Sequence, residues 1–160
     1  MKKSFTLIEL LVVISVTLIF LGISLVQYNT YTEQAKLKNQ AKKIVDVLEL
    51  AKKKALNGDL FDKTCTDFIG YKVTVSSSSY SLLFGCVSIY SAVQNYSLPT
   101  NITLTLGIGD FNFPPLMNNP DFISNTIRLK NSSISTANKC IDISISVIGI
   151  VELNETLISC

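Results

Sequence analysis

Hydrophobic residues dominate the first part of the chain without interruption. Residues 5–26 read FTLIELLVVISVTLIFLGISLV, a run of 22 residues whose single charged member is Glu9. As a helix, this run would measure about 33 Å, enough for the hydrocarbon core of a bilayer, which is about 30 Å thick. Lys2 and Lys3 precede the run, and the positive-inside rule places such lysines on the cytoplasmic side. The pattern predicts a helix that crosses a membrane with its amino terminus in the cytoplasm.

A second pattern follows directly. Between residues 27 and 57, hydrophobic residues recur every three or four positions, which is the period of an amphipathic helix. No proline interrupts residues 5–57, and Asn57 followed by Gly58 is a suitable helix end. The two segments predict one continuous helix over residues 5–56, about 78 Å long. The stripe expected to face a globular head consists of Tyr31, Ala35, Ala41, Ile44, Val45, Leu48, Ala51 and Ala55.

Beyond Gly58 the pattern changes to strict alternation, which is typical of half-buried antiparallel strands. The first two alternating stretches flank the serine run at 76–79 and predict a hairpin. Residues 107–120 hold three of the four prolines and predict a long loop. The stretches predicted as strands are residues 71–75, 80–84, 102–106, 127–130, 141–147 and 150–153.

Together these elements predict an α+β fold, in which a long N-terminal helix packs on a C-terminal antiparallel β-sheet or small β-sandwich. The expected division is a leader at residues 1–4, a membrane-spanning helix at 5–26, an amphipathic stem helix at 27–57 and a β-rich head at 58–160. The net charge is +2, and the signs are segregated. Residues 33–54 hold seven lysines against three acids, whereas residues 57–160 hold five basic residues against eight acidic ones.

Four cysteines lie in the part of the chain that this topology places outside the cytoplasm: Cys65, Cys86, Cys140 and Cys160. An oxidising compartment favours two disulfides, for which three pairings exist. We favour Cys65–Cys86 and Cys140–Cys160, because each closes a loop of about twenty residues and would contribute roughly 3 kcal/mol. Buried, reduced thiols are the alternative.

Glu9 is the unusual residue of the first segment, because a charge inside an apolar span costs about 2.5–3.5 kcal/mol and usually has a function. The segment KKSFTLIELLVVISV closely resembles the N-terminus of type IV prepilins and pseudopilins. The resemblance implies that a prepilin peptidase cuts between Ser4 and Phe5 and methylates the new Phe5 amine. It also implies that Glu9 guides subunits into a filament. The family usually has glycine before the cut, where this chain has Ser4.

The β-rich part resembles one branch of the same family. The order GYKV, SYSLLF, YSLPTNITL and ISVIGIVEL is similar to that of GspH/FimT-like minor pseudopilins. The resemblance implies a structural subunit of a type IV pilus, or of a type II secretion or competence pseudopilus. Such a subunit waits in the cytoplasmic membrane and then enters an extracytoplasmic filament. Its partners would be other pilin subunits, the prepilin peptidase and the inner-membrane assembly platform, and no cofactor is implied.

Other classes of function have less support in the residues. The chain has no histidine, no GxSxG motif and no phosphate-binding loop, which argues against an enzyme. The acids near the C-terminus are too sparse to predict a calcium loop, and no metal site is expected. Two alternatives to an ordinary filament subunit remain. One is a DNA-capturing minor pilin that uses Arg128 and Lys130, which share a strand face, and the other is a plain single-pass anchored surface domain.

Overall fold

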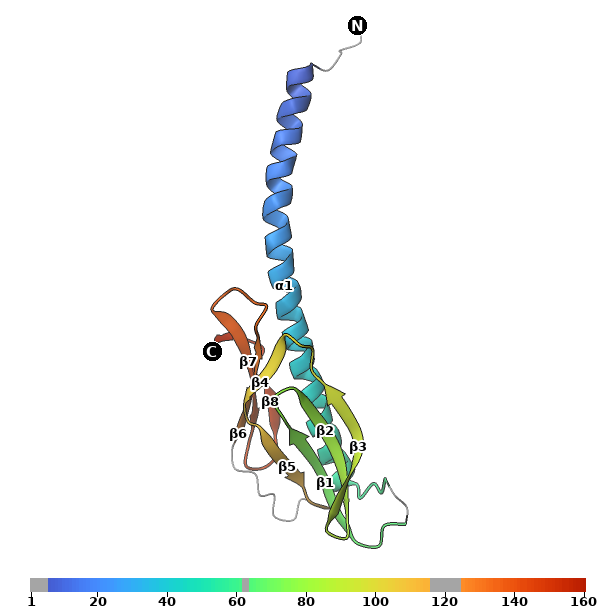
Figure 1. Ribbon diagram of the computed structural model, residues 1–160. Coiled ribbons are helices and arrows are strands. Elements are labelled where there is room, and N and C mark those ends of the chain that lie inside the picture. The colour runs from blue at the N-terminus through green and yellow to red at the C-terminus, as the bar shows by residue number, and fades with distance from the viewer. Residues whose placement is uncertain (1–5, 62–63, 116–124) are drawn as a thin grey trace.

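One long helix runs from the N-terminal end of the molecule into a β-rich head (Figure 1). The computed structural model describes residues 6–61, 64–115 and 125–160, and the side chains of residues 22–27 lie outside this description. Helix α1 (Leu7–Leu56) has 50 residues, which corresponds to about 75 Å. It ends at Leu56, and the N–H of the capping residue Asn57 donates to the carbonyl of Lys53, while the N–H of Gly58 donates to the carbonyl of Ala55. The prediction of one continuous helix is confirmed for Leu7–Leu56, whereas the predicted start at residue 5 lies outside the described residues.

The C-terminal half of α1 packs on the head through a narrow stripe. Its residues lie three or four positions apart, as the period of a helix requires, and they have no exposed surface: Leu37, Ala41, Ile44, Leu48, Ala51 and Ala55. Tyr31 was expected in this stripe, but its side chain is 73% exposed. That expectation was wrong because Tyr31 lies on another face of α1, about 120° around the helix from Leu37, whereas Glu33 lies near the packed face and contacts the head.

The first sheet has the strand order β3-β2-β1-β5, and every neighbouring pair is antiparallel. The predicted hairpin is formed by its two central strands. The order also contains two strands that the alternation did not reveal. One of them, β5, lies inside the segment predicted as a long loop, and that prediction was wrong for these residues. The strands are β1 (Phe68–Val75), β2 (Ser79–Cys86), β3 (Ile89–Ser97) and β5 (Gly109–Phe113).

The second sheet has the order β4-β6-β7-β8, and a short strand, β9, pairs with the start of β7, whereas β8 pairs with the end of β7. All pairings are antiparallel, which confirms the α+β class. Helix α1 contacts strands of both sheets, so a single apolar core is shared between the helix and the two sheets (Figure 1). The strands are β4 (Ile102–Leu106), β6 (Asn125–Asn131), β7 (Asn138–Ile145), β8 (Val151–Leu153) and β9 (Ile158–Ser159).

Gly70 is required where β5 approaches β1. Its φ of 113° lies in a region that other residues rarely adopt, and the register of β1 shifts between Phe68 and Gly70. A Cβ at this position would collide with the carbonyl oxygen of Phe113. The bulge and the missing side chain together allow the last residue of β5 to lie directly against the start of β1.

Two disulfides tie loops to the sheets, so the expectation of disulfide bonds is confirmed. Cys65 bonds to Cys86 at the end of β2, with 5.9 Å between the Cα atoms. Cys140 of β7 bonds to Cys160, with 5.5 Å between the Cα atoms. The first disulfide fastens the connection between α1 and β1, and the second fastens the C-terminus.

Candidate functional site

Glu9, the assembly residue proposed from sequence, lies at the start of α1 and closes a helix cap. Thr6 is the N-cap residue, and its backbone N–H donates to Glu9 Oε2 at 2.9 Å. The Thr6 hydroxyl donates to the same oxygen at 2.8 Å, and the Glu9 N–H donates back to Thr6 Oγ1 at 3.4 Å. This arrangement is a capping box, which satisfies N–H groups that a helix start leaves unpaired. Thr6 was missed from sequence, although the spacing Thr-x-x-Glu is the signal for such a cap.

The surface of α1 beyond this cap is apolar on all sides. Twelve large hydrophobic side chains between positions 7 and 21 are exposed, among them Leu7 at 82%, Ile8 at 71% and Phe20 at 67%. Complete burial of one such side chain stabilises by about 1.5–3 kcal/mol, and these side chains are already partly covered, so the set represents roughly 10–20 kcal/mol that the isolated chain does not realise. This end of α1 is therefore built to be covered by something other than its own head.

The cut site proposed from sequence, Ser4 and Phe5, lies outside the described residues. In the helical residues whose side chains are described, no stretch combines the length and the apolarity that crossing a membrane requires.

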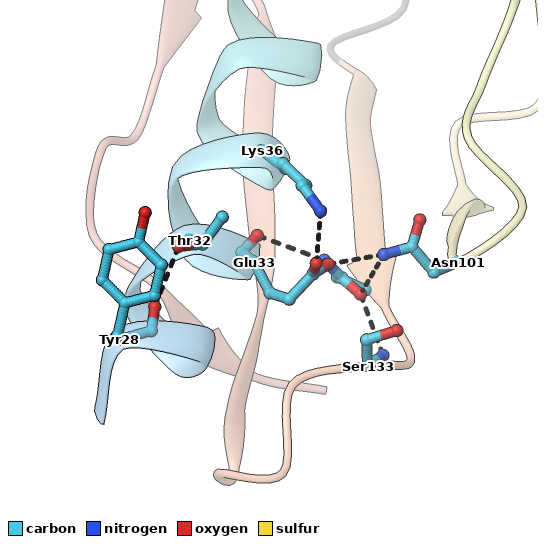
Figure 2. Close-up of polar contacts among 7 residues, drawn as sticks. Tyr28, Thr32, Glu33, Lys36, Asn101 and Ser133 are labelled. Atoms are coloured by element: carbon cyan, nitrogen blue, oxygen red, sulfur yellow. Dashed lines mark hydrogen bonds and ion pairs between the residues drawn. The ribbon is translucent and has the colours of Figure 1, made fainter. Parts of the chain in front are cut away.

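A cluster of polar side chains fastens the head to α1 where the two meet (Figure 2). Asn131, at the end of β6, is fully buried, and its Nδ2 donates to the carbonyl oxygen of Glu33 at 3.1 Å and to Glu33 Oε2 at 3.0 Å. Its Oδ1 accepts from the Ser133 N–H at 2.9 Å and from Asn101 Nδ2 at 3.3 Å. Asn101 also donates to Glu33, and Lys36 closes the cluster with an ion pair at 2.6 Å. We call these five residues the junction cluster.

The junction cluster keeps Glu33 ionised. Hydrogen bonds from Lys36 and then from Asn131 hold the pKa of the Glu33 carboxyl below its usual value. A second attachment lies further along the helix, where Lys52 Nζ donates to the carbonyl of Gly149 at 2.8 Å. Together the two attachments fix how the head sits on α1.

Arg128 and Lys130, the residues proposed for DNA contact, do share one face of β6, opposite the buried Ile127 and Leu129. The Arg128 guanidinium is bound to Asp142 through two hydrogen bonds, from Nε to Oδ1 at 2.7 Å and from Nη2 to Oδ2 at 2.8 Å. A bidentate pair of this kind neutralises most of the positive charge that a phosphate would require.

Other charges of the stem and head are also paired within the chain. Lys42 pairs with Glu155 at 3.3 Å, and Lys72 pairs with Asp110 at 3.0 Å. Among the residues described, no group of three histidine, cysteine or acidic side chains could hold a metal ion.

Comparison with known proteins adds one decisive observation. Residues 1–25 match the model of the prokaryotic N-terminal methylation motif. This is a type IV prepilin-like chain. The matched segment contains both the helix cap at Glu9 and the exposed apolar surface of α1. The match indicates a structural protein. No curated protein and no solved structure matches the prepilin-like chain. The motif ends within α1, so the likeness of the head to GspH/FimT-like minor pseudopilins stays a prediction.

Proposed function

We propose that this prepilin-like chain is a minor pilin or pseudopilin, a structural subunit of a type IV pilus, or of a type II secretion or competence pseudopilus. The observation that carries the proposal is the exposed apolar surface of α1 in a chain that has the methylation motif. Such a surface needs either lipid or the helices of neighbouring subunits around it. Both environments occur in turn during filament assembly.

The proposed division of labour follows the chain. Residues 1–4 are the cytoplasmic leader, residues 5–26 hold the precursor in the cytoplasmic membrane and later form the filament core, residues 27–57 are the stem, and residues 58–160 are the head. The prepilin peptidase removes the leader, and the inner-membrane assembly platform moves the mature subunit into the extracytoplasmic filament among other pilins.

Glu9 has a specific part in this proposal. Its Oε2 accepts both bonds from Thr6, and among the described residues its Oε1 accepts none. Cleavage before Phe5 would create an ammonium group four positions before Glu9 in the sequence. The free oxygen of Glu9 then pairs with an N-terminal ammonium, in the same subunit or in a neighbour packed alongside, and so sets the register between helices.

The first experiment determines the mature N-terminus by mass spectrometry in cells with and without the prepilin peptidase. We expect a chain that starts at N-methylated Phe5 only when the peptidase is present. The matched control is Ser4→Gly, which restores the residue that prepilins usually have before the cut. If the wild-type chain and the control both start at Met1 in both strains, the chain is not a processed subunit, and the plain single-pass anchor replaces this proposal.

A second experiment separates the charge of Glu9 from its capping role. Glu9→Gln retains a capping side chain but removes the charge, whereas Glu9→Val removes both. We expect both variants to insert in the membrane and both to be depleted from sheared fibres, measured by blotting. Depletion of the valine variant alone would show that only the cap matters, and normal incorporation of both would refute the register role.

DNA capture is the alternative and is distinguished by its own assay. A DNA receptor binds DNA in a salt-sensitive manner, and loss of Arg128 and Lys130 weakens that binding. The bidentate pair between Arg128 and Asp142 gives no support to this alternative.

A further inference from the structure

Four asparagines of the head stand in the sequence Asn-x-Ser/Thr, in which x is not proline: Asn95, Asn101, Asn131 and Asn154. In proteins outside the cytoplasm, this sequence is the acceptor signal for a glycan on the asparagine amide nitrogen, Nδ2. Such sequences also arise by chance in a chain rich in Asn, Ser and Thr, so the motif alone selects none of the four. The surroundings of each amide group decide which of them is a usable acceptor.

Two of the four amides are used inside the fold. Asn131 is fully buried, and its Nδ2 donates to the carbonyl and to the carboxylate of Glu33. Asn101 Nδ2 donates to Glu33 and to Asn131 in the same junction cluster. A glycan on either nitrogen would break these bonds and would have no space in the contact between α1 and the head. Asn101 and Asn131 are therefore excluded as acceptors.

Asn95 is exposed, but its backbone is held within strand β3. It pairs with Ser81 of β2, and Ser97, the hydroxyl residue of its motif, pairs with Ser79. Residues two positions apart in a strand are separated by about 6.6 Å, which keeps their side chains apart. No hydrogen bond joins the side chains of Asn95 and Ser97, both of which the structure describes. The hydroxyl of this motif therefore does not act on the Asn95 amide.

Asn154 differs from the other three in its exposure and in its contacts. It lies between β8 and β9, and residues 154–156 are all exposed. The N–H of Thr156 donates to Asn154 Oδ1 at 3.2 Å, and the Thr156 hydroxyl donates to the same oxygen. These bonds form an Asx-turn, in which the asparagine oxygen binds the residue two positions on. In the described part of the chain, no hydrogen bond uses Asn154 Nδ2, so this nitrogen is available.

The turn prepares the Asn154 amide for reaction. An amide nitrogen is a poor nucleophile, because its lone pair is delocalised onto the carbonyl oxygen. When Nδ2 gives up a proton, negative charge gathers on Oδ1, and the two donors of Thr156 stabilise that charge. The hydroxyl at position 156 supplies one of these donors, so the third residue of the motif acts as a positioning and activating residue.

The rest of the fold holds this turn on the surface of the head. The N–H of Asn154 donates to the carbonyl of Asp142 in β7 at 3.0 Å. The next residue, Glu155, pairs with Lys42 of α1 at 3.3 Å, and the disulfide of Cys160 fastens the end of the chain to β7. The folded chain therefore presents the acceptor without local unfolding, and a glycan on Asn154 displaces no buried side chain.

We infer that Asn154 carries an N-linked glycan. The reaction requires a glycosyltransferase and a sugar activated as a glycosyl diphosphate. Asn154 Nδ2 forms a bond to the anomeric carbon, and the bond between that carbon and the diphosphate oxygen breaks. The electron pair of the broken bond leaves with the diphosphate, the proton of Nδ2 passes to a base of the transferase, and nothing is oxidised or reduced. The inference rests on the proposed topology, which places the head outside the cytoplasm.

The test is mass spectrometry of the full-length chain isolated from its own cells, after reduction and digestion with trypsin. Cleavage after Lys139 releases residues 140–160, in which Asn154 is the single asparagine. We expect this peptide to carry the mass of a glycan, and fragmentation of the peptide to place that glycan on Asn154. An unmodified peptide, or a glycan on a serine or threonine instead, overturns the inference.

Substitutions test the role of the turn. Asn154→Gln removes the acceptor and Thr156→Ala removes the hydroxyl donor, so we expect both to abolish the modification, whereas Thr156→Ser retains the hydroxyl and the modification. The matched control is Asn95→Gln, which removes the other exposed motif and should leave the modified peptide unchanged. A glycan on residues 140–160 that persists in Asn154→Gln or in Thr156→Ala contradicts the inference.

The mature N-terminus, read from the same sample, separates this inference from the proposed function. A chain that starts at N-methylated Phe5 and has an unmodified Asn154 overturns the glycan and leaves the proposed function intact. A chain that carries the glycan but still starts at Met1 overturns the proposed processing and retains the glycan.

Discussion

Replacement of Asn131 by alanine tests whether the junction cluster fastens the head to the helix. The Asn131 side chain is fully buried and takes part in four hydrogen bonds, two as donor and two as acceptor. Each buried hydrogen bond contributes about 1 kcal/mol net, and an orphaned partner costs about 1–3 kcal/mol. Glu33 and Asn101 keep their bond to each other, whereas the N–H of Ser133 loses its bond to the Asn131 side chain. We therefore expect Asn131→Ala to cost about 3 kcal/mol.

The assay is thermal unfolding of the full-length chain in detergent, followed by the near-ultraviolet circular dichroism of the head tyrosines. For a head of about 100 residues, 3 kcal/mol corresponds to a fall in melting temperature of roughly 12–24 °C. The matched control is Asn125→Ala at the exposed start of the same strand, where we expect a change within about 0.5 kcal/mol. Equal effects of the two substitutions would refute the role of the cluster.

A double-mutant cycle with Glu33→Gln examines the same contact from the helix side. Because the bonds from Asn131 end on Glu33, the two substitutions together should cost less than the sum of their separate effects. The sign of the pH dependence is also fixed. The folded-state pKa of Glu33 is lowered, so its contribution is present above the unfolded value of 4.5 and is lost as the pH falls through the folded pKa. Additive effects, or an unchanged acid transition in Glu33→Gln, would show that the contact carries no stability.

Two further predictions concern the head. Mass spectrometry of unreduced peptides should find Cys65 linked to Cys86 and Cys140 linked to Cys160, and a peptide that joins Cys65 to Cys140 would refute this connectivity. Burial raises the pKa of Tyr80 to about 12, so its neutral form stabilises the fold, and that stability declines as the pH rises from about 10 to 12. The decline should approach 1.4 kcal/mol per pH unit at most and should be smaller in Tyr80→Phe, measured by urea unfolding. Identical alkaline profiles for the two proteins would show that Tyr80 does not ionise on unfolding in this range.

The strands that sequence revealed and those that it did not differ in one physical respect. In β1, β2, β6 and β7, one face is buried against the core, so hydrophobic residues must alternate. In β3, an edge strand, most side chains are exposed, and the register shift of its pairing with β2 breaks the period of two. Strand β5 is short and lies next to glycine and proline, which predict a loop when only neighbouring residues are considered.

The residues of the candidate site also divide into those that the sequence reveals and those that it does not. Glu9 and the apolar surface of α1 could be found from sequence, because the chemistry lies within one continuous segment. The junction cluster could not, since Glu33 and Asn131 lie 98 positions apart and nothing local in either residue indicates the other. The unusual turn between β2 and β3 was also undetectable, because only the backbone conformation shows that Val87 has a positive φ.

The two attachments of the head to α1 determine how the subunit responds to mechanical load. Glu33 and Lys52 hold the head at points about 29 Å apart along the helix axis. A pull along the helix therefore loads both attachments and the packed stripe between them at the same time, in shear. Unzipping from one end would instead break contacts one after another at low force. In the proposed filament, a head fastened in this manner would remain on its helix while the fibre is stretched.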